Sequence, residues 1–567
     1  MTNKQIARYF KETASLIELT GGNAFRARAF DRAARTLERL EAPASALLDA
    51  GTLTDIPGIG AGLASDVRTL IDHGSFELRD ELLAALPPGL LETLRVKGLG
   101  AKKVRTVWKA LGVTNLEELE AAAATGRLAD LDGFGEKTQE NILHHVKLLK
   151  TYRARRHYAA VVALVEPLLE TLRRQPGFVR VETTGALRRK LETIDTAELI
   201  IATDDRAAAR SALASVVDAV DAPDKDDPSV VTGRFDDGLL LRIYLVAPNR
   251  FGAAWWHHTG SEAHVQAFVE TYGPPADAAE EEAVYRQAGL VFVEPELREG
   301  ADALEAAAED RLPRLITVAD LQGSLHNHST YSDGTHTLRQ MAERARSMGL
   351  SYFGICDHSR SLQVANGMPV ERVLEQQEEI RRLNQTFAQD GGAPFRIFSG
   401  IESDILADGA LDYPDDVLAS FDFVVASIHT RFNMSEQKAT ERVIRAVSNP
   451  YTTILGHPTG RLLLAREGYP LDHRAVIAAC AEHDVVLEIN AHPYRLDLDW
   501  RWIRHATQQG VRLSINPDAH GMDELHHVRW GVAVARKGWL TPDQCLNALP
   551  LDAFARWLTA RRPERVP

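Results

Sequence analysis

The stretch Gly323-Ser-Leu-His326-Asn-His328-Ser-Thr-Tyr-Ser-Asp333-Gly334 decides how the C-terminal half of the chain is interpreted. A short apolar strand leads into His326 and His328. Residues i and i+2 of a strand point to the same side, so both imidazoles can reach one ion. Imidazole nitrogens and the carboxylate of Asp333 together suit zinc, manganese or iron. A His-x-His pair alone is ordinary on protein surfaces, so the prediction of a metal site depends on the sequence that follows.

Seven apolar strands alternate with helical segments from residue 323 onward. We predict them at residues 324–328, 351–356, 395–401, 421–429, 452–457, 485–490 and 511–516. Repeated β–α units indicate a largely parallel sheet. Because polar residues gather at the C-terminal ends of these strands, the pattern favours a distorted (β/α)7 barrel with its functional site at that end.

Six strand ends supply residues that can bind metal ions. A single histidine at a strand end is more often a structural residue than a ligand, but a whole set on one barrel face is hard to explain that way. The nine candidate ligands are His326, His328, Asp333, His358, Glu402, His429, His457, Asp518 and His520. Nine ligands exceed the needs of one ion, and three ions with Glu402 as a bridge fit the number.

Three further polar residues at these strand ends, Arg461, Asn490 and Arg495, are candidate catalytic residues. The two arginines could each bind a phosphate through paired N–H groups. They could equally form structural salt bridges, and the sequence leaves both interpretations open.

A repeated glycine pattern marks the first 150 residues. Its copies are Ile56-Pro-Gly58-Ile-Gly60, Val96-Lys-Gly98-Leu-Gly100 and Leu131-Asp-Gly133-Phe-Gly135, each between helix-like segments. This is the spacing of a helix–hairpin–helix, in which glycines permit a tight turn and the next helix presents N–H groups to a phosphate. One copy could be a plain turn, but three favour binding to the DNA backbone without reading of sequence. Lys102 and Lys103 follow the second turn.

Length and composition set outer limits. The 567 residues, 45% of them hydrophobic, are enough for three to five domains. The formal charge is −14, with the acidic excess after residue 150, which by itself argues against a nucleic-acid partner. Local basic loops and bound cations can reverse that field. No apolar run approaches a membrane span, no signal peptide is evident and the three cysteines show no CxxC spacing, so we expect a cytoplasmic protein.

The strand-end motifs resemble the PHP (polymerase and histidinol phosphatase) phosphoesterase family. The matching segments are HNHSTYSDG at 326–334, CDHS at 356–359, GIE at 400–402, SIH at 427–429, GHPTGR at 456–461 and PDAH at 517–520. The resemblance implies phosphoester hydrolysis with manganese as the first choice of metal and zinc still open. It implies three ions, held by His326, His328, Glu402 and Asp518, by Glu402, His429 and His457, and by Asp333, His358 and His520.

The first 320 residues resemble a family X DNA polymerase, so the whole chain resembles the bacterial polymerase-plus-PHP arrangement. The resemblance rests on the hairpins, FRARAF at 25–30, GALRR at 185–189, HTGSEAH at 258–264 and PELRE at 295–299. It implies a helical DNA-binding domain (1–85), fingers-like (86–150), palm-like (151–248) and thumb-like (249–300) parts, a linker (301–322) and the PHP domain (323–567). Arg188 and Arg189 are implied DNA contacts.

The polymerase site departs from the family pattern. That reaction needs three carboxylates to hold two metal ions, and the matching positions are Thr196, Glu198 and Leu240. The family's sugar-phosphate lyase uses a lysine nucleophile, and Asp66 stands at that position. We therefore expect both activities to be lost, while the front half still binds DNA.

These observations predict a DNA-repair nuclease that removes nucleotides or damaged ends from the 3′ side of single-stranded, gapped or 3′-recessed DNA. Cleavage at abasic sites remains open. The alternatives are a working gap-filling polymerase that uses Glu198, a small-molecule phosphatase related to histidinol phosphatases, and a non-catalytic DNA-binding scaffold. The sequence carries no signal for the oligomeric state.

Overall fold

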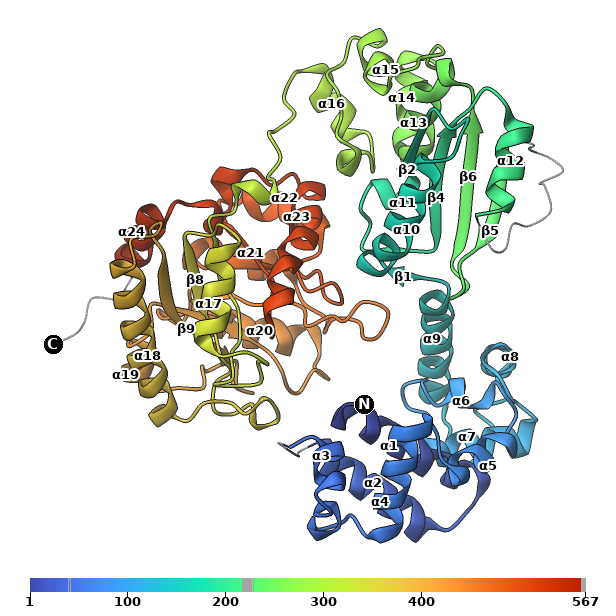
Figure 1. Cartoon of the computed structure of the whole chain (residues 1–567), viewed down its shortest axis with the longest axis vertical. Coiled ribbons are helices and arrows are strands. Elements are labelled where there is room, and N and C mark those ends of the chain that lie inside the picture. Colours follow the sequence, from blue (N-terminus) through green and yellow to red (C-terminus); the bar gives the residue numbers. More distant parts are fainter. Residues whose placement is uncertain (39, 41, 217–226, 228, 562–567) are drawn as a thin grey trace. The chain divides into compact units, whose positions relative to one another are not determined.

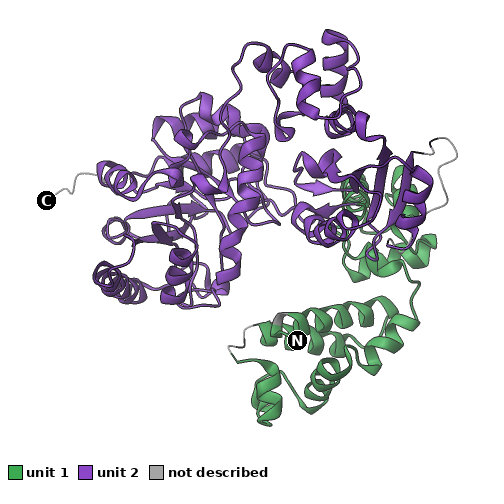
Figure 2. Ribbon diagram, turned by 45° about the horizontal axis from the view of Figure 1, so that its top comes forward, with its two compact units in different colours: residues 1–154 green, residues 155–567 purple. Residues whose placement is uncertain are grey.

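Figure 1 shows the helices and strands of the protein in a computed structural model, which describes residues 1–38, 40, 42–216, 227 and 229–561. The chain divides into two compact units, residues 1–154 (unit 1) and residues 155–567 (unit 2), coloured separately in Figure 2. The predicted fold class, helical domains followed by mixed α/β domains and a seven-stranded barrel, is confirmed. The finer boundaries at residues 85, 248 and 300 stay predictions.

Unit 1 consists of helices wherever the structure describes it. They are α1 Asn3–Thr20, α2 Ala24–Glu38, α3 Ala44–Asp49, α4 Ala61–His73, α5 Glu77–Ala84, α6 Leu90–Thr93, α7 Ala101–Leu111, α8 Leu116–Ala124 and α9 Glu136–Arg153. The periodicity of apolar residues within residues 3–40 predicts two amphipathic helices, and α1 and α2 confirm them. Gly21 ends the first with a left-handed backbone (φ 77°). One core holds the packed rings of Phe10, Phe30 and Phe76, and a second is built around α7, α8 and α9.

The three glycine repeats share one backbone geometry. The first glycine of each, Gly58, Gly98 or Gly133, has a φ between 80° and 97°, a conformation that a side chain disfavours. The second, Gly60, Gly100 or Gly135, is the N-cap of α4, α7 or α9. Each repeat therefore forms a tight turn that opens a helix, as the spacing predicts.

The front part of unit 2 (residues 155–316) is built on a four-stranded sheet with the order β2-β4-β6-β5. Its elements are β1 Arg156–His157, α10 Tyr158–Arg173, β2 Arg180–Thr184, α11 Gly185–Arg188, β3 Thr193–Ile194, β4 Thr196–Ala202, α12 Arg206–Ala214, β5 Val230–Arg234 and β6 Leu240–Val246. The sequence predicts a hairpin from two apolar runs at residues 230–235 and 239–246, and β5 and β6 form it. It also predicts a helix from Ala207 to Val220; α12 extends to Ala214, and residues 217–220 lie outside the described residues. Residues 151–175 are predicted to be helical, but β1 interrupts this stretch.

A set of helices follows this sheet: α13 Phe251–Thr259, α14 Glu262–Tyr272, α15 Glu281–Gln287 and α16 Asp302–Ala308. The last of them lies in the segment 301–322 that we expected to be a linker. Ala303, Leu304 and Ala307 of α16 are buried in the same core as Trp256 and Phe268. Because these small apolar residues fall on one face of a helix, the first half of this segment is packed structure.

The rest of unit 2 is a parallel barrel with its helices outside the strands (Figure 1). Its strands are β7 Gly323–Ser324, β8 Tyr352–Ile355, β9 Arg396–Asp404, β10 Phe423–Ser427, β11 Ile454–Leu455, β12 Val486–Asn490 and β13 Leu513–Asn516, paired in chain order. Its helices are α17 Leu338–Ser347, α18 Val370–Gln389, α19 Asp415–Leu418, α20 Glu436–Val447, α21 His473–Glu482, α22 Trp500–Gln508, α23 Val528–Lys537 and α24 Leu551–Arg561.

The barrel nearly closes just beyond its first and last strands. Asn327 forms a parallel bridge with Ala519, and the His328 N–H donates to the Ala519 carbonyl at 2.8 Å. This bridge brings the segment after β7 against the segment after β13, so candidate ligands from opposite ends of the domain meet.

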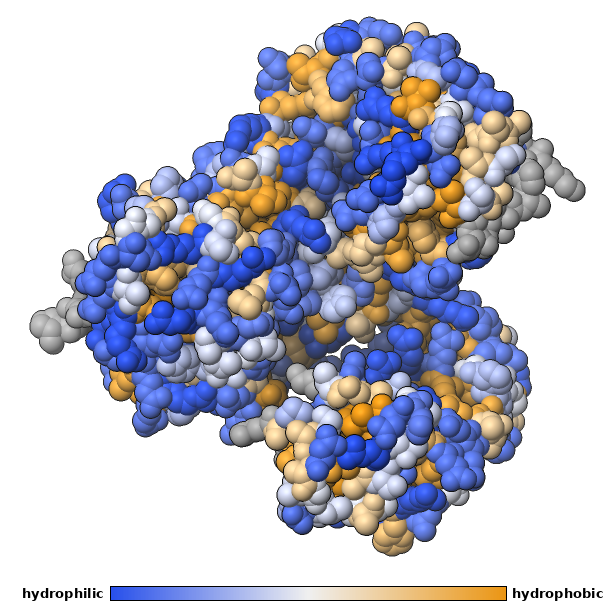
Figure 3. Space-filling model, viewed as in Figure 1, coloured by the Kyte–Doolittle hydropathy of each residue, from blue (hydrophilic) through white to orange (hydrophobic). Residues whose placement is uncertain are grey.

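Hydrophilic residues cover most of the face shown in Figure 3, with hydrophobic residues in scattered patches between them. In the part of the chain that the structure describes, no helix is long and apolar enough to cross a membrane.

Candidate metal centre

Glu402, near the carboxyl end of β9, lies at the centre of the predicted cluster. Its side chain is 1% exposed and its carboxylate oxygens lie within 3.3 Å of four imidazoles, with the imidazole of His328 at 3.7 Å. The distances are 3.3 Å to His326 Nε2, 2.8 Å to His358 Nδ1, 3.1 Å to His429 Nε2 and 3.0 Å to His457 Nε2. Residues from five different strand ends thus meet at one buried carboxylate.

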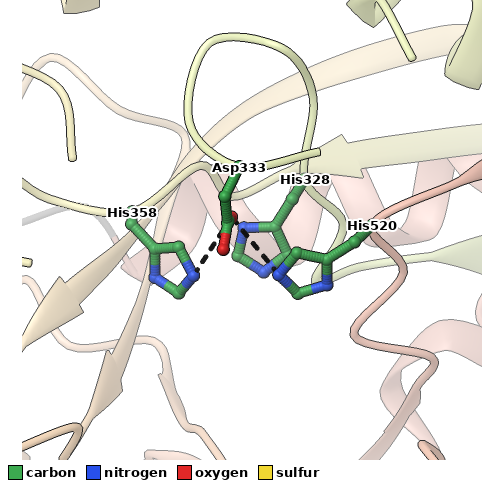
Figure 4. A group of neighbouring side chains, drawn as sticks. All are labelled: His328, Asp333, His358 and His520. Carbon is green, nitrogen blue, oxygen red and sulfur yellow. Dashed lines mark ion pairs between the residues drawn. The ribbon is translucent and has the colours of Figure 1, made fainter. Parts of the chain in front are cut away.

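Asp518 and Asp333 are the two further carboxylates of the cluster. Asp518 Oδ1 lies 3.2 Å from His328 Nε2, and Asp333 Oδ1 lies 3.5 Å from His358 Nε2 and 3.3 Å from His520 Nε2. Figure 4 shows the imidazoles of His358 and His520 turned toward Asp333, with His328 beside them. All nine predicted ligands therefore lie in one cluster.

Three ligands are held by backbone that is unfavourable for residues other than glycine. His326 has a φ of 104°, Asp518 a φ of 52° and His457 a φ of 20°. Such conformations cost about 1–3 kcal/mol each and are typical of functional sites. The prediction that strand alternation orients His326 and His328 is wrong. Strand β7 ends at Ser324, so His326 and His328 lie beyond it and their orientation does not come from strand alternation.

Several buried polar atoms of the cluster have no hydrogen-bond partner, and a cation would satisfy them. They are His326 Nε2, both ring nitrogens of His328, His358 Nδ1, His457 Nδ1 and Glu402 Oε2. Burial of a polar atom without a partner is costly and rare. Nitrogen and carboxylate donors in this number are the chemistry that divalent metals prefer. The residues therefore fit a divalent metal centre.

The donor atoms fall into three groups in which all atoms lie within 4.8 Å of one another: His328 with Asp333, His358 and His520; His326 with His328 and Asp518; and His358 with Glu402 and His429. The first group contains all of the predicted set Asp333, His358 and His520. The second contains every member of the predicted set His326, His328, Glu402 and Asp518 except Glu402. The remaining group pairs Glu402 and His429 with His358 in place of His457. How ligands divide among ions therefore stays a prediction.

The charge of neighbouring imidazoles keeps the central carboxylate of Glu402 ionised. Burial by itself raises the pKa of Glu402, but the imidazoles of His429, His326 and His358 hold it well below its usual range. Burial lowers the pKa of His328 to about 3, with His520 and His358 adding to the effect. Burial by itself lowers the pKa of His429 and His520, but the neighbouring carboxylates raise it to about 10 for His429, beside Glu402, and to about 9 for His520, beside Asp333. Metal binding requires neutral imidazoles, so a bound ion would displace protons from these two rings.

Glu488 on β12 contacts two ligands, His326 and His457, and helps to orient them. The sequence analysis missed this role. Its Oε1 lies 2.6 Å from His326 Nδ1 and accepts from Asn516 Nδ2 at 2.9 Å. Its Oε2 accepts from the His457 N–H at 2.6 Å and from Asn490 Nδ2 at 3.2 Å. The signal in the sequence was its position two residues before Asn490, which places both on one face of β12.

Asp404 is a second supporting carboxylate that the sequence analysis missed. Its Oδ1 lies 2.5 Å from His429 Nδ1, and its Oδ2 accepts from Ser361 Oγ at 2.9 Å. The hydrogen bond fixes the ring so that His429 Nε2 faces Glu402. A carboxylate behind a histidine ligand commonly orients the ring and raises its basicity.

Replacing Asp404 by asparagine is expected to weaken metal affinity by about 10–100-fold, because the imidazole of His429 loses its charged acceptor. Asp408→Asn is the matched control, since Asp408 follows β9 too and its side chain is 60% exposed. Titration of metal-free protein with Mn²⁺, followed by calorimetry, measures both variants. Equal affinities for the two would contradict the orienting role of Asp404.

The structure separates the three candidate catalytic residues. Arg461 donates to Asp499 Oδ2 at 2.6 Å and to the carbonyl of Arg495 at 3.0 Å, so it forms the salt bridge that was one of the two interpretations, and a phosphate contact stays a prediction. Arg495 keeps its place beside the cluster, with Nε 3.5 Å from Asp518 Oδ2 and a side chain 20% exposed. Asn490 is fully buried and donates to Asp518 Oδ2 at 3.0 Å, which makes it a positioning residue.

The three aligned polymerase positions are neighbours on the four-stranded sheet. Thr196 pairs with Leu240, and Glu198 follows on the same face of β4. Glu198 alone carries a carboxylate, and it accepts a hydrogen bond from Tyr244 Oη at 2.9 Å. The nearby Asp237 is 2.6 Å from Arg156 Nε. Among the described residues, this sheet holds no group of three potential metal ligands.

Arg188 and Arg189, which the resemblance implied as DNA contacts, pair with carboxylates within unit 2. Arg188 forms two hydrogen bonds of 2.6 Å with the carboxylate of Glu281 and stacks on Trp255. Arg189 donates to Glu299 at 3.0 Å, and both side chains are nearly buried. Both side chains thus have partners within unit 2, and their contact with DNA stays a prediction.

The two candidate DNA-binding lysines of unit 1 and the residue at its aligned lyase position lie on helices. Lys102 and Lys103 are in the first turn of α7, directly after the second hairpin, with Lys102 exposed. Asp66 lies within α4, and burial raises its pKa. A carboxyl group cannot form a Schiff base, so the lyase reaction lacks its nucleophile at this position.

Comparison with known families matches both ends of the chain. Residues 1–76 match the family described as a helix-hairpin-helix domain, and residues 90–147 match a SAM-like helix-hairpin-helix tandem. Residues 324–492 match the PHP domain.

Among curated proteins, the DNA polymerase/3'-5' exonuclease PolX of Bacillus subtilis (strain 168) is 35% identical over 577 residues, which cover 98% of this chain and 99% of the relative. A probable phosphatase of Acetivibrio thermocellus is 28% identical over 204 residues, 34% of this chain and 78% of the relative. A probable phosphatase of Thermoanaerobacter pseudethanolicus is 29% identical over 161 residues, 27% and 63% respectively.

Proposed function

We propose that this chain, which belongs to the bacterial PolX family of DNA polymerases and 3'-5' exonucleases, hydrolyses phosphodiester bonds from DNA 3′ ends at the metal centre of its barrel. The observation that carries the proposal is the convergence of four imidazoles on the buried carboxylate of Glu402. The chain also has helix-hairpin-helix domains, which indicate DNA binding.

The nine ligands suit three divalent ions, with Mn²⁺ as our first choice and Zn²⁺ as the alternative. Such ions, when bound, lower the pKa of water for attack on phosphorus and neutralise the charge that develops on the phosphate. The chain's own residues hold the site: Glu488 and Asp404 orient histidines, and Asn490 orients Asp518. Arg495 lies where its guanidinium can approach a substrate phosphate.

Templated synthesis is expected to be absent. Of the three aligned polymerase positions only Glu198 keeps a carboxylate, and one carboxylate cannot hold two ions against a triphosphate. Arg188, which the resemblance implied as a DNA contact, is neutralised by Glu281. The front part of unit 2 would then serve to hold DNA and support the barrel. A DNA-acting enzyme of this kind is expected in the cytoplasm.

The proposal is tested by removing metal with a chelator and adding back Mn²⁺ or Zn²⁺. The substrates are a 5′-labelled, 3′-recessed duplex and a small phosphate monoester. We expect Mn²⁺ to restore shortening of the duplex from its 3′ end. Hydrolysis of the monoester with no shortening of DNA would instead favour a small-molecule phosphatase.

Replacing Lys102 and Lys103 together by alanine is expected to weaken DNA binding, because both cations lie at the helix that opens after the second hairpin. The slope of log affinity against log salt should fall by about one for each DNA phosphate that the variant no longer neutralises. Lys109→Ala with Lys147→Ala removes the same charge from other turns of α7 and α9 and is the control. If both double variants have the same salt dependence, the hairpin does not bind the backbone.

A further inference from the structure

An aromatic cluster lies where the barrel meets the front part of unit 2. Tyr494, after β12, is 54% exposed. The centroid of its ring lies 4.6 Å from that of His157 and 5.3 Å from that of His492. His157 belongs to β1, so the cluster joins the first strand of unit 2 to a barrel loop.

Short contacts connect this cluster to the metal centre. Asn490 donates to Asp518 at 3.0 Å, and its Oδ1 accepts from the His492 N–H at 3.1 Å. His492 Nδ1 in turn accepts from the Tyr494 N–H at 3.3 Å. Arg495, the next residue, reaches to 3.5 Å from Asp518 Oδ2. The exposed ring therefore lies a few side chains from the reacting site.

The cluster is held in place before any ligand binds. The Tyr494 carbonyl accepts from the Leu463 N–H at 2.7 Å, and the Leu463 carbonyl lies 2.9 Å from His157 Nε2. The backbone of Leu463 thus contacts the ring of His157 and holds the backbone of Tyr494. The ring of His527 lies 5.2 Å from that of His492, and its buried Nδ1 has no hydrogen-bond partner. A preformed surface of this kind loses little entropy on binding.

We propose that Tyr494, with His157 and His492, forms a stacking platform for the bases next to the scissile phosphate of a single-stranded DNA 3′ end. This inference rests on the proposed nuclease function. Aromatic rings stack on any base, which suits an enzyme that removes nucleotides regardless of sequence. Arg495 lies between the platform and the metal centre, in position to pair with the phosphate.

The platform gives the front part of unit 2 a role in hydrolysis. His157 forms one wall of the platform, and its packing against Tyr494 depends on β1. The polymerase-like half would thus direct the 3′ end into the barrel without binding a nucleoside triphosphate. A small phosphate monoester has no neighbouring base and would not use the platform.

The test uses full-length, Mn²⁺-loaded protein and two 5′-labelled single strands, one normal and one with abasic residues at its last positions. We expect Tyr494→Ala to raise KM for the normal strand by roughly 5- to 150-fold, the range of base–aromatic stacking. KM for the abasic strand should stay unchanged, and Tyr494→Phe should behave like the wild type. Leu374→Ala, which truncates a 59% exposed side chain on α18, is the control.

Three other results would each overturn one part of this proposal. Equal losses on both strands would mean that Tyr494 has only a structural role, and no loss on either would mean that no base stacks there. If wild-type protein shortens neither strand, the nuclease function itself fails. Retained activity of Tyr494→Phe shows that the fold tolerates changes at this position.

Discussion

Replacing Glu402 by glutamine is expected to reduce phosphodiester hydrolysis by about 10³-fold or more. Glutamine keeps the shape of the side chain but removes the negative charge that four imidazoles surround. Metal ions supply several kcal/mol of transition-state stabilisation, and each 1.4 kcal/mol is about tenfold in rate. A site without its central carboxylate should lose much of that contribution.

The variant is compared with Glu378→Gln, a substitution on the outer helix α18 whose side chain is 47% exposed. An exposed ion pair contributes little, so this control should keep its activity. Elemental analysis of both purified proteins reports metal content, and unchanged thermal unfolding shows that the barrel is intact. An active, metal-loaded Glu402→Gln protein would show that neither metal binding nor hydrolysis requires the carboxylate of Glu402.

Replacing Glu281 by alanine is expected to lower the free energy of unfolding of unit 2 by about 3–5 kcal/mol, the cost of breaking a buried ion pair. Glu281 is 1% exposed and lies 2.5 Å from the Nη1 of Arg298, which is fully buried, and 2.6 Å from Arg188. Without the carboxylate, the charge of Arg298 stays buried and uncompensated. Fluorescence of the nearby Trp255 and Trp256 follows the unfolding in denaturant.

The neighbouring Glu280→Ala is the matched control. Glu280 is 66% exposed and pairs with Arg180 at 3.1 Å, so its loss should cost about 1 kcal/mol or less. A similar cost for both variants would show that the buried ion pairs of Glu281 stabilise unit 2 no more than the exposed ion pair of Glu280 does.

The contribution of Glu281 also has a predicted pH dependence. Burial by itself raises the pKa of Glu281, but Arg188 and Arg298 lower it overall. A carboxyl group whose pKa is lower in the folded state stabilises the fold above its unfolded pKa of about 4.3. That stability is lost as the pH falls toward the folded pKa. The difference in stability between wild type and Glu281→Ala should therefore shrink below about pH 4.3.

The barrel could be predicted from the sequence because its signals are local. Strands such as β10, Phe423–Ser427, are continuous apolar runs, and the polar residues that follow them mark one end of a parallel barrel. The same logic placed all nine candidate ligands in one cluster. The helix α16 was missed because acidic, alanine-rich sequence resembles a linker unless its buried face is known.

The partners of individual charged residues could not be predicted, because tertiary contacts decide them. Arg461 pairs with Asp499, 38 residues away, and Arg188 pairs with Glu281, 93 residues away. The supporting role of Asp404 had a weak local signal, since it lies two residues after Glu402 on the same face of β9. Alternation alone does not show that a neighbouring loop brings His429 to its side chain.

The most direct test of the proposed function uses a 5′-labelled primer on a gapped template with Mn²⁺, with and without deoxynucleoside triphosphates. We predict that wild-type protein shortens the primer in both conditions and that Glu402→Gln leaves it intact. Extension of the primer when the triphosphates are present would contradict this prediction. It would mean that Glu198 and its neighbours still support synthesis, and that the barrel is an accessory nuclease.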